Sequence, residues 1–326
     1  MKFAVLGGGG CFGLNLARKL LIEGHEVIGI GRSALRAEAF TLGTDRLGYR
    51  YRMLSIGRDN EFVMNVLDAE RPEVIVNFAA QGEGAASFKA QNWKYFFDTN
   101  ATALVALTEQ LHKRDWLRRF IHIGTSEIYG SVDAAVAEDA VLRPSSPYAA
   151  SKAAFDMHLL AVSRKLGFPA LIVRPSNCYT PGQQLHRVIP KAMLHFALLR
   201  KFQLHGAGVA RKSYLHASDL SDALLLLADK GKDGEIYNVG PMEPVSIRVL
   251  VEGCARRMGV DPLTSIEHVA DRTGQDGCYW LDSRKIALLG WKQRIRMENG
   301  LDEMRDWIVE HLNYLCHEST DYHMRS

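Results

Sequence analysis

What the sequence lacks narrows the class of protein before any motif is considered. The five cysteines are scattered along 326 residues and include no C-x-x-C pair, so neither a disulfide framework nor a zinc site is indicated. Scattered cysteines of this kind are typical of a reducing compartment. The histidines show no metal-ligand spacing, and we therefore expect no metal. The cysteines are Cys11, Cys178, Cys254, Cys278 and Cys316.

Long apolar runs and strong net charge are also missing. No run of about 18 apolar residues exists, which argues against a membrane-spanning helix. The first residues show no basic-then-apolar leader. The net charge is only +3, so nothing in the composition favours nucleic acid or an acidic membrane as a partner. We expect a soluble cytoplasmic protein, long enough for one large or two moderate domains.

A glycine-rich turn at residues 7–13 is the first informative motif. Residues 2–6 form a short apolar run typical of a buried parallel strand, and residues 14–21 are apolar at helical spacing. In a strand–turn–helix unit, glycines let the backbone approach a pyrophosphate, which binds at the helix N-terminus. This context favours a dinucleotide site over a merely flexible loop, with Cys11 as a small filler rather than a nucleophile. The expected contacts are Gly7, Gly10, Cys11, Phe12 and Gly13.

The end of the second expected strand, residues 26–30, indicates which dinucleotide binds. NAD-binding units usually carry Asp or Glu here for the ribose hydroxyls, whereas this chain continues Gly31-Arg32-Ser33. Arg32 can pair with a 2′-phosphate and Ser33 can donate a hydrogen bond to it. We therefore expect NADP, with NAD as the alternative if Arg32 is simply a solvated surface residue.

Small and polar residues follow two further buried strands, residues 74–78 and 120–124. Ala79 and Ala80 permit close approach of a cofactor after the first of these strands. Residues 125–127 lie just beyond the end of the second, where open α/β sheets bind their ligands. For Glu127 a structural capping role is the alternative to chemistry.

Tyr148 and Lys152 are four residues apart, so they share one face of an expected helix. A nearby ammonium favours the phenolate, and a tyrosine pKa lowered from about 10 toward neutrality suits a base that takes a proton from an alcohol. Alone the pair is weak, because such spacing often arises by chance. The pair becomes evidence for a catalytic site because residues 125–127 precede it in the sequence.

The alternation of apolar strands and helices predicts an α/β fold, a Rossmann-type doubly wound parallel sheet with a smaller C-terminal substrate-binding lobe. We expect a cofactor domain at residues 1–175 and a substrate lobe at 176–326, with segments around 215–240 returning to the first domain. Residues 206–219 look like a hairpin-like excursion, and Asp219 is expected to cap a helix over 220–228. Further helices are expected at 101–112, 148–166 and 301–312.

Several linked motifs in the same order resemble one family over nearly the whole length. The chain resembles extended short-chain dehydrogenases/reductases of the nucleotide-sugar epimerase/dehydratase group, and within it most the sugar 4,6-dehydratases. The motifs lie at residues 7–13, 77–80, 125–130, 146–152, 174–177, 237–240 and 271–276.

This resemblance implies a role for each matching residue. Tyr148 and Lys152 would be the oxidation pair, Thr125 would hold the sugar 4-hydroxyl, and Glu127 would remove the proton at C5. A homodimer through the helices at 101–112 and 148–166 is implied as well. The residues expected to contact a nucleotide-diphosphate sugar are Gln81, Asn177, Arg187, Lys212 and Arg272.

Departures from the family pattern leave alternatives open. Ser126 stands where the dTDP-glucose enzymes carry an aspartic acid, and a serine hydroxyl is a poor acid. Lys212 takes the usual arginine position, and Arg187 with Lys191 forms a phosphate-facing pair or only a solvated helix face. A C4 epimerase and a nucleotide-uronate decarboxylase remain alternatives. A non-enzymatic dinucleotide sensor is disfavoured because both members of the Tyr–Lys pair are present.

Overall fold

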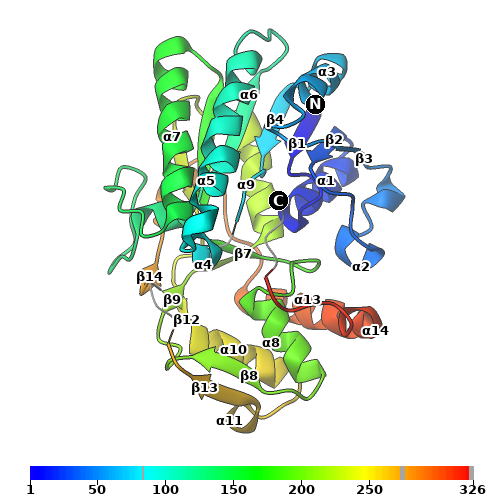
Figure 1. Ribbon diagram of the computed structural model, residues 1–326, viewed down its shortest axis with the longest axis vertical. Coiled ribbons are helices and arrows are strands. Elements are labelled where there is room, and N and C mark those ends of the chain that lie inside the picture. Colours follow the sequence, from blue (N-terminus) through cyan, green and yellow to red (C-terminus); the bar gives the residue numbers. More distant parts are fainter. Residues whose placement is uncertain (83, 272–275, 323–326) are drawn as a thin grey trace.

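A computed structural model of the protein describes residues 1–82, 84–271 and 276–322. Its largest feature is a sheet of seven parallel strands in the order β11-β6-β5-β4-β1-β2-β3 (Figure 1). The doubly wound parallel sheet predicted from the sequence is confirmed. The strands are β1 (Lys2–Leu6), β2 (Glu26–Gly31), β3 (Arg50–Met53), β4 (Val74–Asn77), β5 (Arg119–Ile123), β6 (Ala170–Pro175) and β11 (Ile236–Val239).

Helices cover both faces of the sheet because both faces of its strands are apolar. Val5 points to one face and packs with the helices α1 and α9, whereas Ala4 and Leu6 point to the other and pack with α3, α6 and α7. Strands buried on both faces form continuous apolar runs, which is why most of them are visible in the sequence. The helices are α1 (Cys11–Ile22), α3 (Asn60–Glu70), α6 (Ala103–Leu111), α7 (Pro147–Leu166) and α9 (Ala217–Lys230).

A second core lies beside the carboxyl edge of the sheet, in the lower part of Figure 1. It is built around the helices α8 (Val188–Ala197), α10 (Ile247–Arg257) and α13 (Met297–Glu310). Short strands extend it: β8 (Phe202–His205) pairs with β13 (Ile266–Val269), and β9 (Arg211–Lys212) lies between β12 (Val245–Ser246) and β14 (Cys278–Tyr279). A separate parallel pair is formed by β7 (Asn177–Tyr179) and β10 (Tyr214–His216).

Short elements complete the described chain. They are α2 (Glu38–Thr41), α4 (Gly84–Ser87), α5 (Trp93–Phe97), α11 (Pro262–Ser265), α12 (Arg284–Ala287) and α14 (Leu312–Leu315), with single turns η1 (Asp45–Leu47), η2 (Ala90–Asn92), η3 (Asp98–Thr102) and η4 (Ser126–Tyr129). No helix in the described ranges is long and apolar enough to cross a membrane.

Two local predictions are wrong for the same reason. Residues 206–219 form no hairpin, because β9 pairs with β12 and β14, and β10 pairs with β7. Asp219 does not cap a helix: α9 begins earlier, and its cap is His216, which accepts from the Ser218 N–H at 3.3 Å. The Asp219 carboxylate instead accepts from the backbone N–H groups of Arg294 at 2.8 Å and Ile295 at 3.1 Å. The partners that decide these conformations are distant in sequence.

Two glycines in helices of the second core should respond oppositely to the same substitution. A Cβ on Gly253 would meet nothing closer than Leu301 Cδ1 at 3.7 Å, whereas a Cβ on Gly300 would overlap the hydroxyl of buried Tyr179. We expect Gly253→Ala to raise the free energy of unfolding by about 0.5–1 kcal/mol through lower chain entropy. Gly300→Ala should lower it by about 1–3 kcal/mol through overpacking. Urea unfolding of both variants measures the two changes in the free energy of unfolding, and changes of the same sign would contradict this packing.

Candidate active site

The carboxyl ends of the parallel strands open into a cavity of about 1220 Å³. This exceeds the range of about 300–1,000 Å³ that is usual for one drug-sized ligand, so it has room for a cofactor and a substrate together. The cavity brings together most of the residues singled out in the sequence. They are Gly7, Gly10, Cys11, Phe12, Gly13, Arg32, Ser33, Ala79, Ala80, Gln81, Thr125, Ser126, Glu127, Tyr148, Lys152, Asn177 and Arg187.

Two of the expected substrate residues are not among these lining residues. Lys212 is not among the described lining residues, and Arg272 lies outside the part of the chain that the structure describes. Among the described residues, no group of three or more His, Cys, Asp or Glu side chains is arranged to hold a metal ion.

The glycine turn forms a cradle that fits a dinucleotide pyrophosphate. Gly7 has a φ of 76°, and a Cβ there would lie 2.8 Å from the Ala79 nitrogen. A Cβ on Gly13 would lie 2.7 Å from the Gly7 carbonyl oxygen, so helix α1 approaches the turn closely only because this residue is glycine. No side chain caps the N-terminus of α1, which leaves its first turn suited to an anion.

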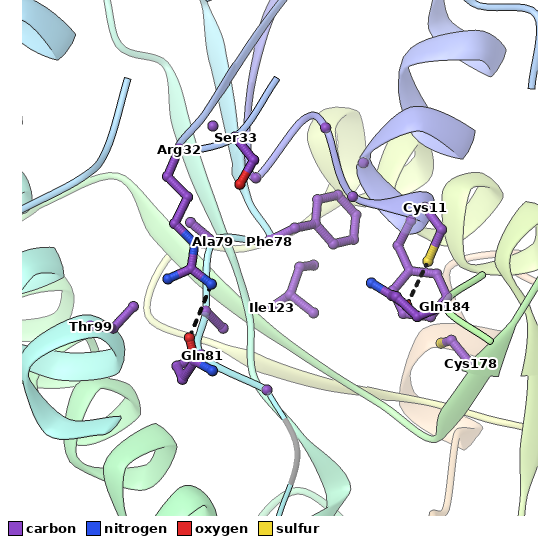
Figure 2. Close-up of a pocket in the computed structure, with 18 of the residues that line it drawn as sticks. Cys11, Arg32, Ser33, Phe78, Ala79, Gln81, Thr99, Ile123, Cys178 and Gln184 are labelled. Carbon is purple, nitrogen blue, oxygen red and sulfur yellow. Dashed lines mark hydrogen bonds between the residues drawn. The ribbon is translucent and has the colours of Figure 1, made fainter. Parts of the chain in front are cut away.

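Cys11 has the properties of a packing residue. Its side chain is buried, and burial raises the pKa of the thiol to about 12. The sulfur lies 3.7 Å from Gln184 Oε1 (Figure 2). A thiol this far from ionisation is a poor nucleophile, as the sequence predicts.

A chain of polar contacts crosses the cavity below the end of β2. The Arg32 guanidinium donates to Gln81 Oε1 at 3.1 Å, as Figure 2 shows. Gln81 Nε2 donates to Tyr322 Oη at 2.7 Å, and that hydroxyl donates to the Gly82 carbonyl at 3.1 Å. A residue near the C-terminal end of the chain therefore forms part of the wall of the cavity. No sequence signal marks Tyr322 for this place, because the contact is set by tertiary packing alone.

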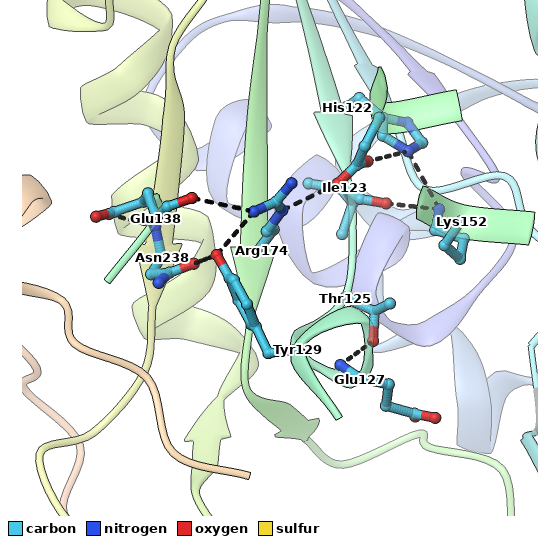
Figure 3. A network of polar contacts seen from close by, with 10 residues as sticks. His122, Ile123, Thr125, Glu127, Tyr129, Glu138, Lys152, Arg174 and Asn238 are labelled. Atoms are coloured by element: carbon cyan, nitrogen blue, oxygen red, sulfur yellow. Dashed lines mark hydrogen bonds and ion pairs between the residues drawn. The ribbon is translucent and has the colours of Figure 1, made fainter. Parts of the chain in front are cut away.

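Tyr148 and Lys152 lie on the first turns of helix α7, which is well defined at its start. Ser146 is the N-cap and accepts from the Ala149 N–H at 3.1 Å, and Pro147 occupies the first helical position. The Lys152 ammonium donates to the Ile123 carbonyl at 2.7 Å (Figure 3). Lys152 is only 2% exposed, and its burial lowers the pKa of the ammonium to about 8. A buried cation one helical turn from a tyrosine favours the phenolate form of that tyrosine.

Thr125, Ser126 and Glu127 turn sharply away from the end of β5. Thr125 Oγ1 accepts from the Glu127 N–H at 3.3 Å and so caps the short helix η4. The capping side chain is thus Thr125, and the Glu127 side chain lines the cavity. Ser126 is 4% exposed and also lines the cavity. A carboxylate and a tyrosine base therefore belong to one pocket, although they come from different elements.

Lys212 is buried against an aromatic ring. Its ammonium lies 3.2 Å from the centroid of the Tyr279 ring and donates to the Asp276 carbonyl at 3.1 Å. Burial lowers the pKa of Lys212 to about 8, while the negative charge of Glu127 acts in the opposite direction. Tyr279 and Asp276 carry no sequence signal for this role, because they come from a distant part of the chain: Tyr279 lies in strand β14, and Asp276 precedes that strand.

Comparison with known proteins decides the family. Residues 3–240 match the model of the NAD dependent epimerase/dehydratase family. The chain belongs to this family. The resemblance recognised from the linked motifs is therefore confirmed.

Relatives whose names state an activity are about 30% identical to this chain over the aligned residues. A trifunctional protein of Arabidopsis thaliana, named as a UDP-glucose 4,6-dehydratase, 3,5-epimerase and reductase, is 34% identical over 77% of the chain; the chain covers only 38% of that relative's length. A dTDP-glucose 4,6-dehydratase of Streptomyces niveus is 31% identical, and the match covers 94% of this chain and 92% of the relative. The crystal structure of a dTDP-glucose 4,6-dehydratase of Streptomyces venezuelae with NAD bound has 29% identity and a TM-score of 0.88, covering 96% of this chain and 98% of that one.

Proposed function

We propose that this family member is a nucleotide-sugar 4,6-dehydratase, which converts a nucleotide-linked sugar to its 4-keto-6-deoxy product. The observation that carries the proposal is the meeting of Glu127 with the pair Tyr148 and Lys152 in one cavity. An alcohol oxidation needs one base, and proton removal from carbon needs a second. The 4,6-dehydratase names of the relatives from Streptomyces niveus and Streptomyces venezuelae support the same reaction.

The oxidation step uses the residues of helix α7. A nicotinamide dinucleotide, when bound, accepts a hydride from C4 of the sugar and later returns it to C6. Tyr148 takes the proton of the 4-hydroxyl, while Thr125 holds that hydroxyl in place. Lys152 stabilises the Tyr148 phenolate by its positive charge. The glycine cradle at residues 7–13 and the small residues Ala79 and Ala80 hold the dinucleotide.

The elimination step uses Glu127 and Ser126. The new ketone at C4 acidifies the neighbouring C5–H, and the Glu127 carboxylate removes that proton. The C6 hydroxyl then leaves as water, with Ser126 donating a hydrogen bond to it or relaying a proton from water. After hydride returns to C6, Glu127 gives its proton back to C5. Tyr148 then releases to solvent the proton that it took from the 4-hydroxyl, which balances the proton that the departing water received. The sugar has lost one water and gained no net reducing equivalents.

The substrate we propose is glucose linked to dTDP or UDP. These two nucleotides occur in the names of the relatives, and the diphosphate would be held by Asn177 and Arg187, which line the cavity. Arg272 and Lys212 are further candidates for this contact. Incubation with UDP-, dTDP-, GDP- and CDP-sugars, followed by detection of a 4-keto product, tests the proposal directly. Release of CO₂ from a nucleotide uronate, or inversion at C4 without loss of water, would show a decarboxylase or an epimerase instead.

Replacing Glu127 by Gln should stop elimination without disturbing the cofactor site. We expect the rate of 4-keto-6-deoxy product formation to fall by about 10²–10⁴-fold, because the amide cannot act as a base. Exchange of deuterium from solvent into C5 should fall in parallel, while the dissociation constant of the dinucleotide stays constant. Glu109, which is exposed on helix α6, gives the matched control Glu109→Gln. Normal product formation by Glu127→Gln would remove Glu127 from the mechanism.

We further infer a preference for NADP over NAD. The end of β2 carries no carboxylate, and the Arg32 guanidinium faces the cavity together with Ser33. Titration of cofactor-free protein with both dinucleotides should give tighter binding of NADP. Arg32→Gln should weaken NADP binding about tenfold or more, because a charge-assisted hydrogen bond is lost, and leave NAD binding nearly unchanged. Arg18→Gln, at an exposed position of helix α1, is the control. Tenfold tighter binding of NAD, the cofactor in the relative from Streptomyces venezuelae, would refute the preference.

A homodimer through helices α6 and α7 is the assembly we propose. Met157 and Leu166 of α7 are each 63% exposed, and Trp93 and Phe97 of the neighbouring helix α5 are exposed as well. Exposed apolar side chains of this size are typical of a contact between subunits. Sedimentation equilibrium at micromolar concentration should give a dimer, and Met157→Glu should shift it toward monomer. A monomeric wild-type protein would contradict this assembly.

A further inference from the structure

A buried polar network lies directly behind the Tyr–Lys pair, and the reaction described above makes no use of it. His122 of strand β5, Asp156 of helix α7 and Arg174 of strand β6 are each at most 1% exposed. The Nε2 atom of His122 lies 3.3 Å from the Lys152 ammonium nitrogen. The sequence motifs contain Lys152 but give no sign of the histidine behind it.

The hydrogen bonds of Asn77 determine which nitrogen of His122 carries a proton. The Ala79 N–H donates to Asn77 Oδ1 at 3.0 Å, so the amide nitrogen must point the other way. That nitrogen lies 3.0 Å from His122 Nδ1 and has only hydrogens to offer, so Nδ1 is the acceptor. Burial, with Lys152 and Arg174 nearby, holds the pKa of His122 well below its usual range. The ring is therefore neutral, with its single proton on Nε2.

Among the described contacts, the Nε2–H group has two polar neighbours, of which one is a fixed acceptor. Asp156 Oδ1 lies 3.6 Å away and has no hydrogen-bond partner among the described residues. The nitrogen of Lys152 is closer, but a protonated ammonium has no lone pair with which to accept. A neutral Lys152 amine does have one. The contact is therefore a hydrogen bond only after Lys152 has lost its proton, and while Lys152 is charged the Nε2–H faces Asp156.

Other charged groups around Lys152 come from each element packed against it. Asp156 and Tyr148 lie on its own helix, and Arg174 faces it from β6, where Arg174 Nε donates to Asp156 Oδ2 at 2.9 Å. Tyr129 of η4 accepts from Arg174 at 2.7 Å. Asp156 favours the charged form of Lys152, but its carboxylate is shared with Arg174. The Nε2–H of His122 is thus the one donor directed at the amine from strand β5 among the described contacts.

We propose that His122 is a positioning residue of the oxidation step: as a fixed Nε2–H tautomer it stabilises the neutral form of Lys152, and so sets the pH above which this lysine loses the charge that stabilises the Tyr148 phenolate. The proposal rests on the oxidation role of the Tyr–Lys pair proposed above. It also gives Asn77 a role, because the Asn77 amide N–H donates to His122 Nδ1 and so fixes the histidine proton on Nε2. Without the histidine donor, Lys152 should keep its proton to a higher pH.

The tautomer can be measured in the resting wild-type protein, without substrate. Nitrogen-15 NMR of labelled histidine distinguishes a protonated nitrogen from an unprotonated one. We expect His122 to be neutral with the proton on Nε2 from about pH 5.5 to 8.5. Asn77→Asp, in which the amide is replaced by a carboxylate that only accepts, should move the proton to Nδ1. A charged ring, or a proton on Nδ1 in the wild type, would overturn the proposal whether or not any variant folds.

The titration of Lys152 gives the second readout. The carbon-13 signal of its Cε, assigned by its loss in Lys152→Met, should titrate near pH 8 in the wild type. His122→Phe should raise that midpoint by about half to one pH unit, the value of one neutral hydrogen bond. His158→Phe is the matched control. His158 lies on helix α7 with Lys152 and, like His122, contacts the Phe155 ring, but its Nε2 lies 3.3 Å from Thr108 Oγ1 and not against Lys152. An unchanged or lower midpoint in His122→Phe would refute the role of the histidine.

The activity assay separates this inference from the proposed reaction. In a working dehydratase, the alkaline limb of the pH profile of kcat/KM should move upward in His122→Phe by the same amount as the NMR midpoint. If no nucleotide sugar is converted, the reaction is wrong, yet the NMR results still decide the role of His122. If product forms normally and neither the limb nor the midpoint moves, His122 is only a structural residue.

Discussion

The buried ion pair of Asp156 and Arg174 connects the elements that make up the site. It joins helix α7 to strand β6, and Arg174 continues the connection through Tyr129 to Asn238 of β11. Leaving one member of such a pair alone in the interior costs about 3–5 kcal/mol, so the two elements are held in one relative position. Tyr148 and Lys152 stand on the same helix, and their placement against the sheet follows from this contact.

Much of the fold could be predicted because its strands are buried on both faces. The runs that became β1, β2, β4, β5 and β6 are mainly apolar, and each precedes a turn or a helix. Strand β3 was missed because it lies at the edge of the sheet, where its Arg50-Tyr51-Arg52-Met53 sequence is half-exposed or exposed. Asp219 was misread because its partners are backbone groups some 75 positions along the chain.

The residues of the candidate site fall into the same two groups: those marked by a local sequence pattern and those placed by a contact with a distant part of the chain. Residues that belong to a local motif, such as the glycine turn and the Tyr–Lys helix, were found from that motif and the segments around it, and the cavity brings them together. Residues that act through a tertiary contact were not found. Tyr322 reaches Gln81 across 241 positions, and His122 reaches Lys152 from a different strand at a separation of 30. Neither has a pattern in its own neighbourhood that sets it apart from an ordinary tyrosine or a core histidine.

The position of β11 has a consequence for the order in which the molecule is built. Strand β6 ends at Pro175. Its outer neighbour in the sheet is formed by residues 236–239, which come later in the sequence than much of the second core. During synthesis from the N-terminus, β6 must wait with an open edge until this later segment leaves the ribosome. Its side chains are buried in the finished protein, so a nascent chain or a fragment stopped near residue 175 presents an apolar strand edge that invites aggregation. The first half of the chain is thus dependent on the second for its own completion.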